Sequence, residues 1–528
     1  MSPTAIVLLV LSAAAVATGA VTVWRRPAAA LAVFAVGFAL HNLVLLLLVG
    51  SGAPTLGIRV VQAWKEGYVA LLGIRLARQV LLSGGAAYLR GRLAAWSSLA
   101  RVPKVLDAVA IAFAMLLVAY LLVPSSMLPA PSPTLGQRVL DFRTLVLLPA
   151  LYVCGRVWPP TAVRDRRAML GTVAAVGALV TIVGLIELWF IPTKAWYDAG
   201  IYRLDLFEGY RYVGPGGLPE NFFQSTTTGL GLRRMVSTYL SPLGIAYTGL
   251  LMAPVALVGA LASTRRARWW WAAFALIVIG ISLSVTRLAL GCLAVEAVAL
   301  AVLLRRRVVL LAAALTLLAA AAALLVYPNV GPVLDYNLNA VRPTWGGYLL
   351  GYDISPYDPL SPVYDGTPPV VFDDLSADLV ARISSGEDAS IQAHLAALPE
   401  GTNFVLDHPL GLGLGASMPR LGGATGPRES AVLAIGGELG LLGLVLFVVL
   451  YAGVFLAGGY LIWIHRRDLR QAPLAVVLGV ASLALGPIVV TSQLWGDPSV
   501  TYPFWWIAGA CIAAWPARGA SLQQIGPA

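Results

Sequence analysis

The sequence predicts an all-α polytopic membrane protein, and three observations support this prediction. Hydrophobic residues make up 59% of the 528-residue chain, charged residues make up 12%, and the mean hydropathy is +0.81. Soluble globular proteins have about 45–50% apolar and about 25% charged residues. The apolar residues also fall in runs of about 20, the length that crosses a bilayer as a helix. This composition excludes a soluble enzyme, a disordered chain and a fibrous repeat.

The net charge of +11 comes mainly from short basic stretches between the apolar runs. Twenty of the 36 Lys and Arg residues stand at 25–26, 90–104, 156–167, 265–268, 305–307, 466–470 and 518. These stretches occupy alternate loops, as the positive-inside rule describes for cytoplasmic loops. The charge therefore indicates topology and gives no reason to expect a nucleic-acid partner.

Placing every basic stretch on the cytoplasmic side predicts about 13 transmembrane helices, within a range of 12–14, with the N-terminus outside and the C-terminus inside. The predicted spans are 5–23, 28–50, 60–82, 105–123, 138–157, 169–190, 237–262, 269–284, 288–304, 308–326, 431–464, 473–491 and 501–516. The first lacks a basic leader, so we read it as a retained helix and not a cleaved signal. The third is amphipathic, as an interfacial helix is.

The spans divide the chain into five regions. They are an N-terminal bundle of about six spans (1–190), an external loop (191–236), central spans (237–326), a large external loop between spans 10 and 11 (327–430) and C-terminal spans (431–528). The first half of the large loop is rich in Pro, Tyr and Gly, which predicts irregular turns. Its second half, Phe372–Leu406, has a helical pattern.

The sequence predicts neither a metal nor a cofactor. The three cysteines, Cys154, Cys292 and Cys511, all lie inside apolar runs and have no metal-binding spacing. Asp373, Asp374 and Asp378 form the one acidic cluster that suggests a metal. A solvated helix start is the favoured reading, because Asp and Glu are enriched there.

Two arginines, Arg233 and Arg234, stand where an outer loop enters the seventh span, and the second begins the stretch Arg234-Met-Val-Ser-Thr-Tyr-Leu-Ser-Pro242. An arginine at a membrane entrance needs an anionic partner or water. Arg233 and Arg234 together suit a diphosphate, which guanidinium groups bind through paired hydrogen bonds. The alternative is a pair of interfacial side chains that snorkel to the water.

Arg287 lies in the stretch Ile281-Ser-Leu-Ser-Val-Thr-Arg287, at a tight outer reversal between two spans. The positive-inside rule does not favour an arginine at this position. An ionisable residue there is by default a candidate functional residue. The alternative is a structural pair with Glu296 or another carboxylate.

A third stretch closes the large loop. It contains Asp407-His408-Pro-Leu-Gly-Leu-Gly-Leu-Gly415 and then Arg428-Glu429-Ser430, followed by the eleventh span with Glu438-Leu-Gly440-Leu-Leu-Gly443. Glu429 stands at a helix N-terminus, which favours the carboxylate form. Partial burial would move its pKa towards the neutral range that suits a general base. The alternative is a helix-start carboxylate without a role in a reaction.

In this order, the three stretches resemble the O-antigen ligase/polymerase-like family of membrane glycosyltransferases. That family has an Arg-containing entry to a span, a Ser-x-x-Arg-like turn between two spans, and a long external loop with a His-Pro-x-x-Gly-x-Gly element. A span with Glu-x-Gly-x-x-Gly follows. The resemblance covers about residues 231–464, whereas the first six spans are compatible only in number.

The resemblance implies an inverting, metal-independent transfer of a glycan from a polyprenyl-diphosphate carrier to an acceptor hydroxyl. The transfer takes place on the outer face of the cytoplasmic (inner) membrane. Arg234 and Arg287 match the arginines taken to hold the diphosphate, and fixed guanidinium groups suit the charge that grows on this leaving group. Glu429 occupies the place of the family's acceptor-activating histidine, eleven residues before Gly440, so a polymerase is as compatible as a ligase. Arg233, His408 and Arg428 are further candidates for binding the glycan or its diphosphate.

A transporter or flippase of a lipid-linked saccharide is the alternative. Many transporters have two related halves and a binding site at the membrane midplane. Here one long outer loop breaks any such symmetry, and the candidate charges collect on the outer side. The sequence therefore favours the glycosyltransferase.

Overall fold

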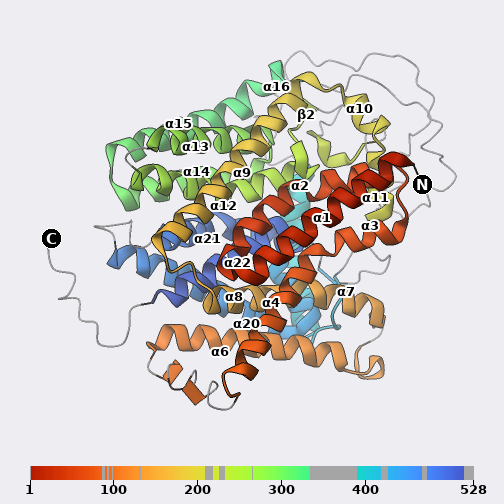
Figure 1. Ribbon diagram of the computed structural model, residues 1–528, viewed down its shortest axis with the longest axis vertical. Coiled ribbons are helices and arrows are strands. Elements are labelled where there is room, and N and C mark those ends of the chain that lie inside the picture. Colours follow the sequence, from red (N-terminus) through yellow and green to blue (C-terminus); the bar gives the residue numbers. More distant parts are fainter. Residues whose placement is uncertain are drawn as a thin grey trace.

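The computed structural model describes residues 2–85, 90–91, 94, 96–97, 99–129, 132–208, 218–224, 232–263, 266–332, 389–417, 426–427, 429–465 and 473–515. Most of them are helical (Figure 1). The longer helices are α1 (Pro3–Arg25), α2 (Ala30–Gly50), α4 (Trp64–Leu82), α6 (Arg101–Leu122), α9 (Val163–Phe190), α12 (Pro242–Ala262), α13 (Ala267–Leu283), α14 (Arg287–Leu304), α15 (Arg307–Leu325), α19 (Ala389–Asp407), α20 (Ala431–Ile464), α21 (Pro473–Thr491) and α22 (Pro498–Ala513).

The shorter elements lie between these helices in the chain. They are α3 (Thr55–Gln62), α7 (Leu135–Leu145), α8 (Leu147–Val157), α10 (Thr193–Asp198), α11 (Ile201–Glu208), α16 (Tyr327–Val330), and the 3₁₀ turns at Pro27–Ala29, Ser125–Met127, Glu220–Phe222, Ser237–Tyr239 and Leu494–Gly496. The only sheet among the described residues is the antiparallel pair β1 (Phe223–Gln224) and β2 (Leu232–Arg233), in which Phe223 pairs with Arg233.

Nine helices in the described part of the chain are long and apolar enough to cross a membrane. They are α1, α2 with the turn before it, α6, α9, α12, α14, α15, α20 and α21. The apolar helix α13 is shorter, at 17 residues. The prediction of an all-α membrane protein is confirmed at this level.

Helices that are apolar on all sides occupy the middle of the bundle, as expected when no face meets water. All residues of α22 from Ser499 to Ile512 are buried. It crosses α8 closely, since a Cβ on Gly155 would lie 2.1 Å from the carbonyl oxygen of Trp506, and one on Gly509 would lie 2.0 Å from that of Tyr152. Glycine at this crossing lets the two backbones touch.

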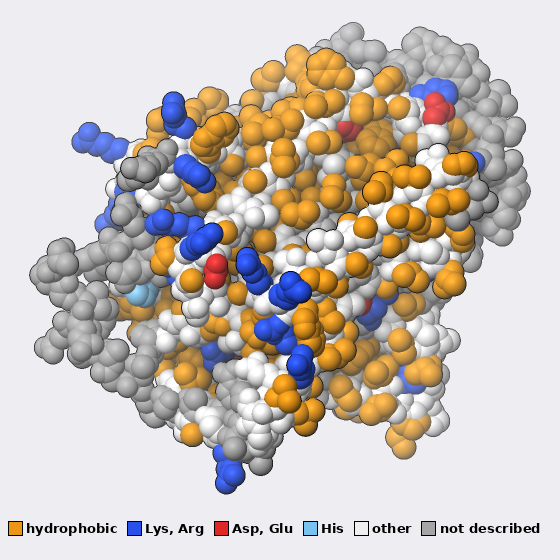
Figure 2. Space-filling view, viewed as in Figure 1, with side chains coloured by type: hydrophobic (Ala, Val, Ile, Leu, Met, Phe, Trp, Pro, Cys, Tyr) orange, Lys and Arg blue, Asp and Glu red, His pale blue; other side chains and the backbone are white. Residues whose placement is uncertain are grey.

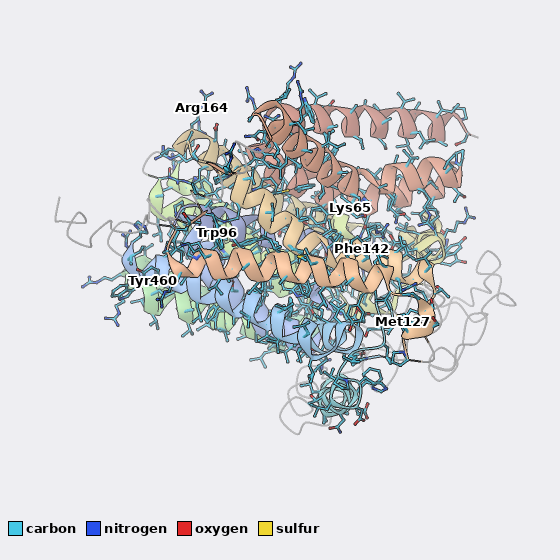
Figure 3. The ribbon with its side chains drawn as sticks, turned by 90° about the horizontal axis from the view of Figure 1, so that it is seen from below. Lys65, Trp96, Met127, Phe142, Arg164 and Tyr460 are labelled. Atoms are coloured by element: carbon cyan, nitrogen blue, oxygen red, sulfur yellow. The ribbon has the colours of Figure 1, made fainter. Side chains whose placement is uncertain are left out.

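The bundle has two chemically different ends. Helices α9, α13 and α15 begin beside basic residues at one end of the bundle, which we call the basic end. They finish at the opposite end, where α12, α14, α20 and α22 begin, and we call this the loop end. Figure 2 shows Lys and Arg side chains gathered mainly over the left and lower centre of a largely hydrophobic face. In Figure 3, Arg164 and Tyr460 lie towards one end, Met127 lies at the other, and Lys65 and Phe142 lie between them.

Two predicted spans contain interruptions. The span predicted at 138–157 consists of two consecutive helices, α7 and α8. Pro149, in the first turn of α8, has no N–H to continue the α7 hydrogen-bond ladder. The span predicted at 431–464 is the single helix α20, but Gly440 interrupts it with φ 69° and ψ −170°. Only glycine adopts that backbone conformation readily.

The second half of the large loop is described only from residue 389, where α19 begins. The predicted irregular half of that loop and the cluster Asp373, Asp374 and Asp378 lie outside the described residues. The predictions made for this half of the loop and for the aspartate cluster stay untested.

Candidate functional site

The structure brings Arg234 to the turn that carries Arg287. The Arg234 Nε donates to the carbonyl oxygen of Ser284 at 2.7 Å, and one of its terminal nitrogens donates to Oγ1 of Thr286 at 2.7 Å. The backbone N–H of Met235 donates to the carbonyl oxygen of Leu283, which fastens the same two segments. Burial lowers the pKa of Arg234 to about 10, and the positive charge of Arg287 acts in the same direction. The two guanidinium groups therefore lie within each other's electrostatic reach.

The turn before Arg287 has a strained backbone. Val285 has φ 48°, a left-handed conformation that is a genuine outlier for a β-branched residue. Such strain concentrates at functional sites, where the surrounding structure must hold it. The Ser284 hydroxyl donates to the carbonyl oxygen of Ile281, and the backbone N–H of Thr286 donates to the Ser284 hydroxyl. Arg287 then begins α14 and is half-buried.

The alternative pairing of Arg287 with Glu296 is not seen. Glu296 is buried on α14, two and a half turns further along, and neither of its carboxyl oxygens has a hydrogen-bond partner in the described part of the chain. It lines a very small apolar cavity with Leu257 and Phe274. Glu296 therefore does not explain why an arginine stands at position 287.

Arg233 points away from this turn and has a structural partner. It forms a buried ion pair with Glu187 of α9, with Nη2 and Oε1 2.6 Å apart, and Nη1 donates to the carbonyl oxygen of Ile191. The other carboxylate oxygen of Glu187 accepts from the backbone N–H groups of Val236 and Ser237. Through these contacts Arg233 fastens the loop to α9.

The other predicted residues have different surroundings. His408 stacks on Phe404 with ring centroids 4.5 Å apart, and its Nδ1 lies 2.9 Å from the Phe404 carbonyl oxygen. Glu429 is exposed in the structure. It precedes Ser430, which caps α20 by accepting from the N–H of Leu433. Arg428 lies outside the described residues.

The glycines after His408 fit the interruption of α20. Gly411, Gly413 and Gly415 all have positive φ, as does Gly440. The N–H of Gly413 donates to the carbonyl oxygen of Glu438, and the N–H of Leu441 donates to the carbonyl oxygen of Pro409. This segment, 408–417, therefore supplies the backbone hydrogen bonds that the interrupted helix lacks.

A cavity of about 650 Å³ lies at the loop end, next to these elements. Its walls come from α2, α3, α4, α7, α8, the end of α11, residues 219–221, residues 239–247 with the start of α12, the start of α20 and the segment 492–502. Its ionisable lining residues, tyrosines apart, are His41, Lys65, Glu66, Asp141, Arg143, Glu208, Glu438 and Asp497. Arg234 and Arg287 do not line it, but Tyr247 does, and Tyr247 interacts electrostatically with Arg234. Ala431, two residues after Glu429, is also part of the wall.

Sequence reasoning missed the carboxyl groups in this wall. Asp141 and Glu438 are both buried and are hydrogen-bonded to each other. Asp141 also accepts from the N–H of Gly415, and Glu438 accepts from the N–H of Ser417. The sequence feature that could have identified both residues is their position, because an acidic residue inside a predicted span is a functional candidate by default. Asp497, outside the spans, caps α22, and burial raises its pKa.

No group of three or more His, Cys, Asp and Glu residues suited to a metal ion occurs in the parts of the chain that the structure describes. Comparison with known proteins finds no matching family model and no matching curated protein. The assignment of a function therefore rests on the residues and their geometry.

Proposed function

We propose that this protein is a membrane glycosyltransferase that moves a glycan from a polyprenyl-diphosphate carrier to an acceptor hydroxyl. In this proposal Arg234 and Arg287 bind the diphosphate without a metal ion. The sugar and acceptor occupy the cavity beside them, and the transfer inverts the anomeric centre. The product is either a longer polysaccharide, as from a polymerase, or a glycan joined to another acceptor, as from an O-antigen ligase.

One observation carries the proposal: the guanidinium group of Arg234 is fastened to the turn that presents Arg287. Two cations that are near each other and partly desolvated repel unless an anion lies between them. A diphosphate offers oxygens for both groups, and its negative charge grows as the bond to the sugar breaks. Guanidinium groups held in place before the reaction stabilise that charge with little reorganisation.

The proposal includes the finer topology that the sequence predicts. It has about thirteen spans, the N-terminus outside, the C-terminus in the cytoplasm, and the loop end with its cavity facing outwards. Under this orientation the donor arrives from the outer leaflet of the cytoplasmic membrane. Glu429 stays the sequence-based prediction for the group that accepts the proton of the acceptor hydroxyl.

A transporter of a lipid-linked saccharide is the second candidate, and the interruption of α20 is the observation that favours it. Discontinuous helices beside a polar cavity are typical of transporter binding sites. Here, however, segment 408–417 fills the interruption with backbone hydrogen bonds, and the cavity lies at the loop end. These features fit a fixed catalytic wall better than a moving gate.

Replacing Arg287 tests the proposal. In proteoliposomes supplied with a polyprenyl-diphosphate oligosaccharide and an acceptor, we expect Arg287→Ala to slow transfer by about 10²–10³-fold, the usual effect of removing one charge-stabilising donor. Arg306→Ala is the matched control, because Arg306 is exposed at the basic end, and it should retain the wild-type rate. Equal rates in the two variants would remove Arg287 from the reaction.

A further inference from the structure

Three side chains on α2 and α4 form a hydrogen-bonded chain that reaches the cavity. The indole N–H of Trp64 donates to Nδ1 of His41 at 3.1 Å. On the other side of the imidazole, Nε2 lies 3.3 Å from Nζ of Lys65. His41 and Lys65 both line the cavity, and Figure 3 places Lys65 within the bundle, between its two ends.

The direction of the first hydrogen bond determines the second. An indole N–H can only donate, so Nδ1 of His41 must accept and carries no hydrogen. The neutral imidazole then has its hydrogen on Nε2, and that N–H points at Nζ of Lys65. It can be accepted there only by a lone pair, which an uncharged amine has and an ammonium group lacks. A charged Lys65 would place two N–H donors against each other at 3.3 Å.

The burial of Lys65 also favours the uncharged form. The residue is 8% exposed, and burial disfavours the charged form of a lysine. Its Nζ donates to the carbonyl oxygen of Gln62 at 3.2 Å. The carboxylate of Glu66 lies 3.9 Å from Nζ and also pairs with Arg143 of α7 at 3.5 Å.

The other elements around this cluster present both kinds of charge. Tyr502 of α22 interacts with Glu66 and Arg143. Asp141 and Glu438 stand in the cavity wall with it, and Glu208 lines the same cavity. Since Arg143 shares the charge of Glu66, the carboxylate beside Lys65 is partly neutralised before it can favour an ammonium group.

We propose that Lys65 is an uncharged amine in the resting protein and accepts the proton of a hydroxyl group bound in the cavity. The second part rests on the proposed glycosyl transfer. There the Lys65 amine turns its single lone pair from the His41 N–H to the bound hydroxyl and takes the hydroxyl proton, and the hydroxyl oxygen forms the new bond to the anomeric carbon. The bond from that carbon to the diphosphate breaks, and its electron pair leaves with the diphosphate. The ammonium group then returns its proton to water in the cavity.

The first experiment measures the protonation of Lys65 without any substrate. The chain has only three lysines, Lys65, Lys104 and Lys194, so trace acetylation by acetic anhydride followed by mass spectrometry resolves each one. Only the uncharged amine reacts. We expect the labelling rate of Lys65 at pH 7.5 to exceed about one third of its rate at pH 11, whereas an ordinary lysine reaches roughly one hundredth or less.

Lys194 is the internal control, because its side chain is half exposed and pairs with Asp198. A Lys65 curve that coincides with the Lys194 curve would overturn the proposal. Absence of labelling at every pH would also overturn it, because an amine that a small reagent cannot reach from the cavity cannot take a proton from a substrate there.

A substitution that leaves Lys65 in place tests whether the hydrogen bond from Trp64 to His41 keeps Lys65 uncharged. Trp64→Phe removes the indole donor, so Nδ1 of His41 can carry the hydrogen and Nε2 can accept from an ammonium group. We expect the labelling rate of Lys65 at pH 7.5 to fall at least about tenfold relative to its rate at pH 11, as the charged form gains a partner. An unchanged ratio would contradict the hydrogen-bond argument.

The catalytic part has its own readout. If Lys65 accepts the proton, Lys65→Met slows transfer by about 10²–10⁴-fold, while the control Lys194→Met stays within about threefold of wild type. If only Glu429→Gln loses activity, the role belongs to Glu429 and the catalytic part of the proposal fails. If no variant and no wild-type protein transfers glycan, the proposed function fails, while the labelling result still decides the charge of Lys65.

Discussion

At the scale of single residues, two neighbouring arginines, Arg233 and Arg234, make different contacts. Arg233 is buried against Glu187, whereas Arg234 reaches the turn that carries Arg287. Arg233 is the last residue of β2, and Arg234 follows it directly, so the two surroundings lie one residue apart in the chain. One arginine can therefore fasten the loop to α9 while the next serves the candidate site.

The ion pair of Arg233 and Glu187 leads to a prediction about stability. Removing one partner leaves the other charge buried without compensation, which typically costs about 3–5 kcal/mol. We expect Arg233→Met to lower the thermal unfolding temperature in detergent strongly, and the double variant with Glu187→Leu to recover much of the loss. A double variant no more stable than Arg233→Met alone would contradict the pairing.

At the scale of elements, the interruption of α20 depends on one glycine. A Cβ on Gly440 would lie 2.3 Å from the carbonyl oxygen of Pro409, and the residue has φ 69°. A side chain at this position therefore strains the backbone and pushes segment 408–417 away from Glu438. The interruption and the segment form one structural unit.

We predict that Gly440→Ala destabilises the protein by at least about 1–2 kcal/mol, the usual cost of the left-handed conformation for a residue with a Cβ. Gly459→Ala is the matched control, because Gly459 lies in the same helix and has open space around it. That control should be neutral or stabilising, since alanine favours a helix. Thermal unfolding of both variants checks the prediction, and equal melting temperatures would contradict it.

The helices were predictable from the sequence because apolar runs are a local property. The runs that became α12, α15 and α21 were recognised within a few residues of their ends. The interruption at Gly440 was not, because it depends on hydrogen bonds to the distant residue Pro409. The same limit applies to side chains: Glu187 was not recognised as the partner of Arg233, and the tautomer argument for Lys65 needs His41 and Trp64 in contact.

At the scale of the whole molecule, basic residues gather at one end of the bundle, and the cavity lies at the other. In the proposed orientation, the basic end faces the cytoplasm and the cavity faces outwards. The three native cysteines are buried, so they contribute little background to cysteine labelling.

We therefore predict that a membrane-impermeant maleimide added to intact cells labels Lys194→Cys, at the loop end, and does not label Arg306→Cys, at the basic end. Permeabilised cells should label both. The reverse pattern in intact cells would show that the cavity faces the cytoplasm, and the proposed outer-face reaction would fail with it.

The most direct test of the central claim is a single assay of the purified protein in proteoliposomes. The donor is a polyprenyl-diphosphate oligosaccharide, and an acceptor glycan is present with it. A glycosyltransferase produces a longer or transferred glycan together with free polyprenyl diphosphate, and a ladder of lengths would identify a polymerase. Movement of intact donor between the two leaflets, with no bond cleaved, would contradict the claim and favour a transporter.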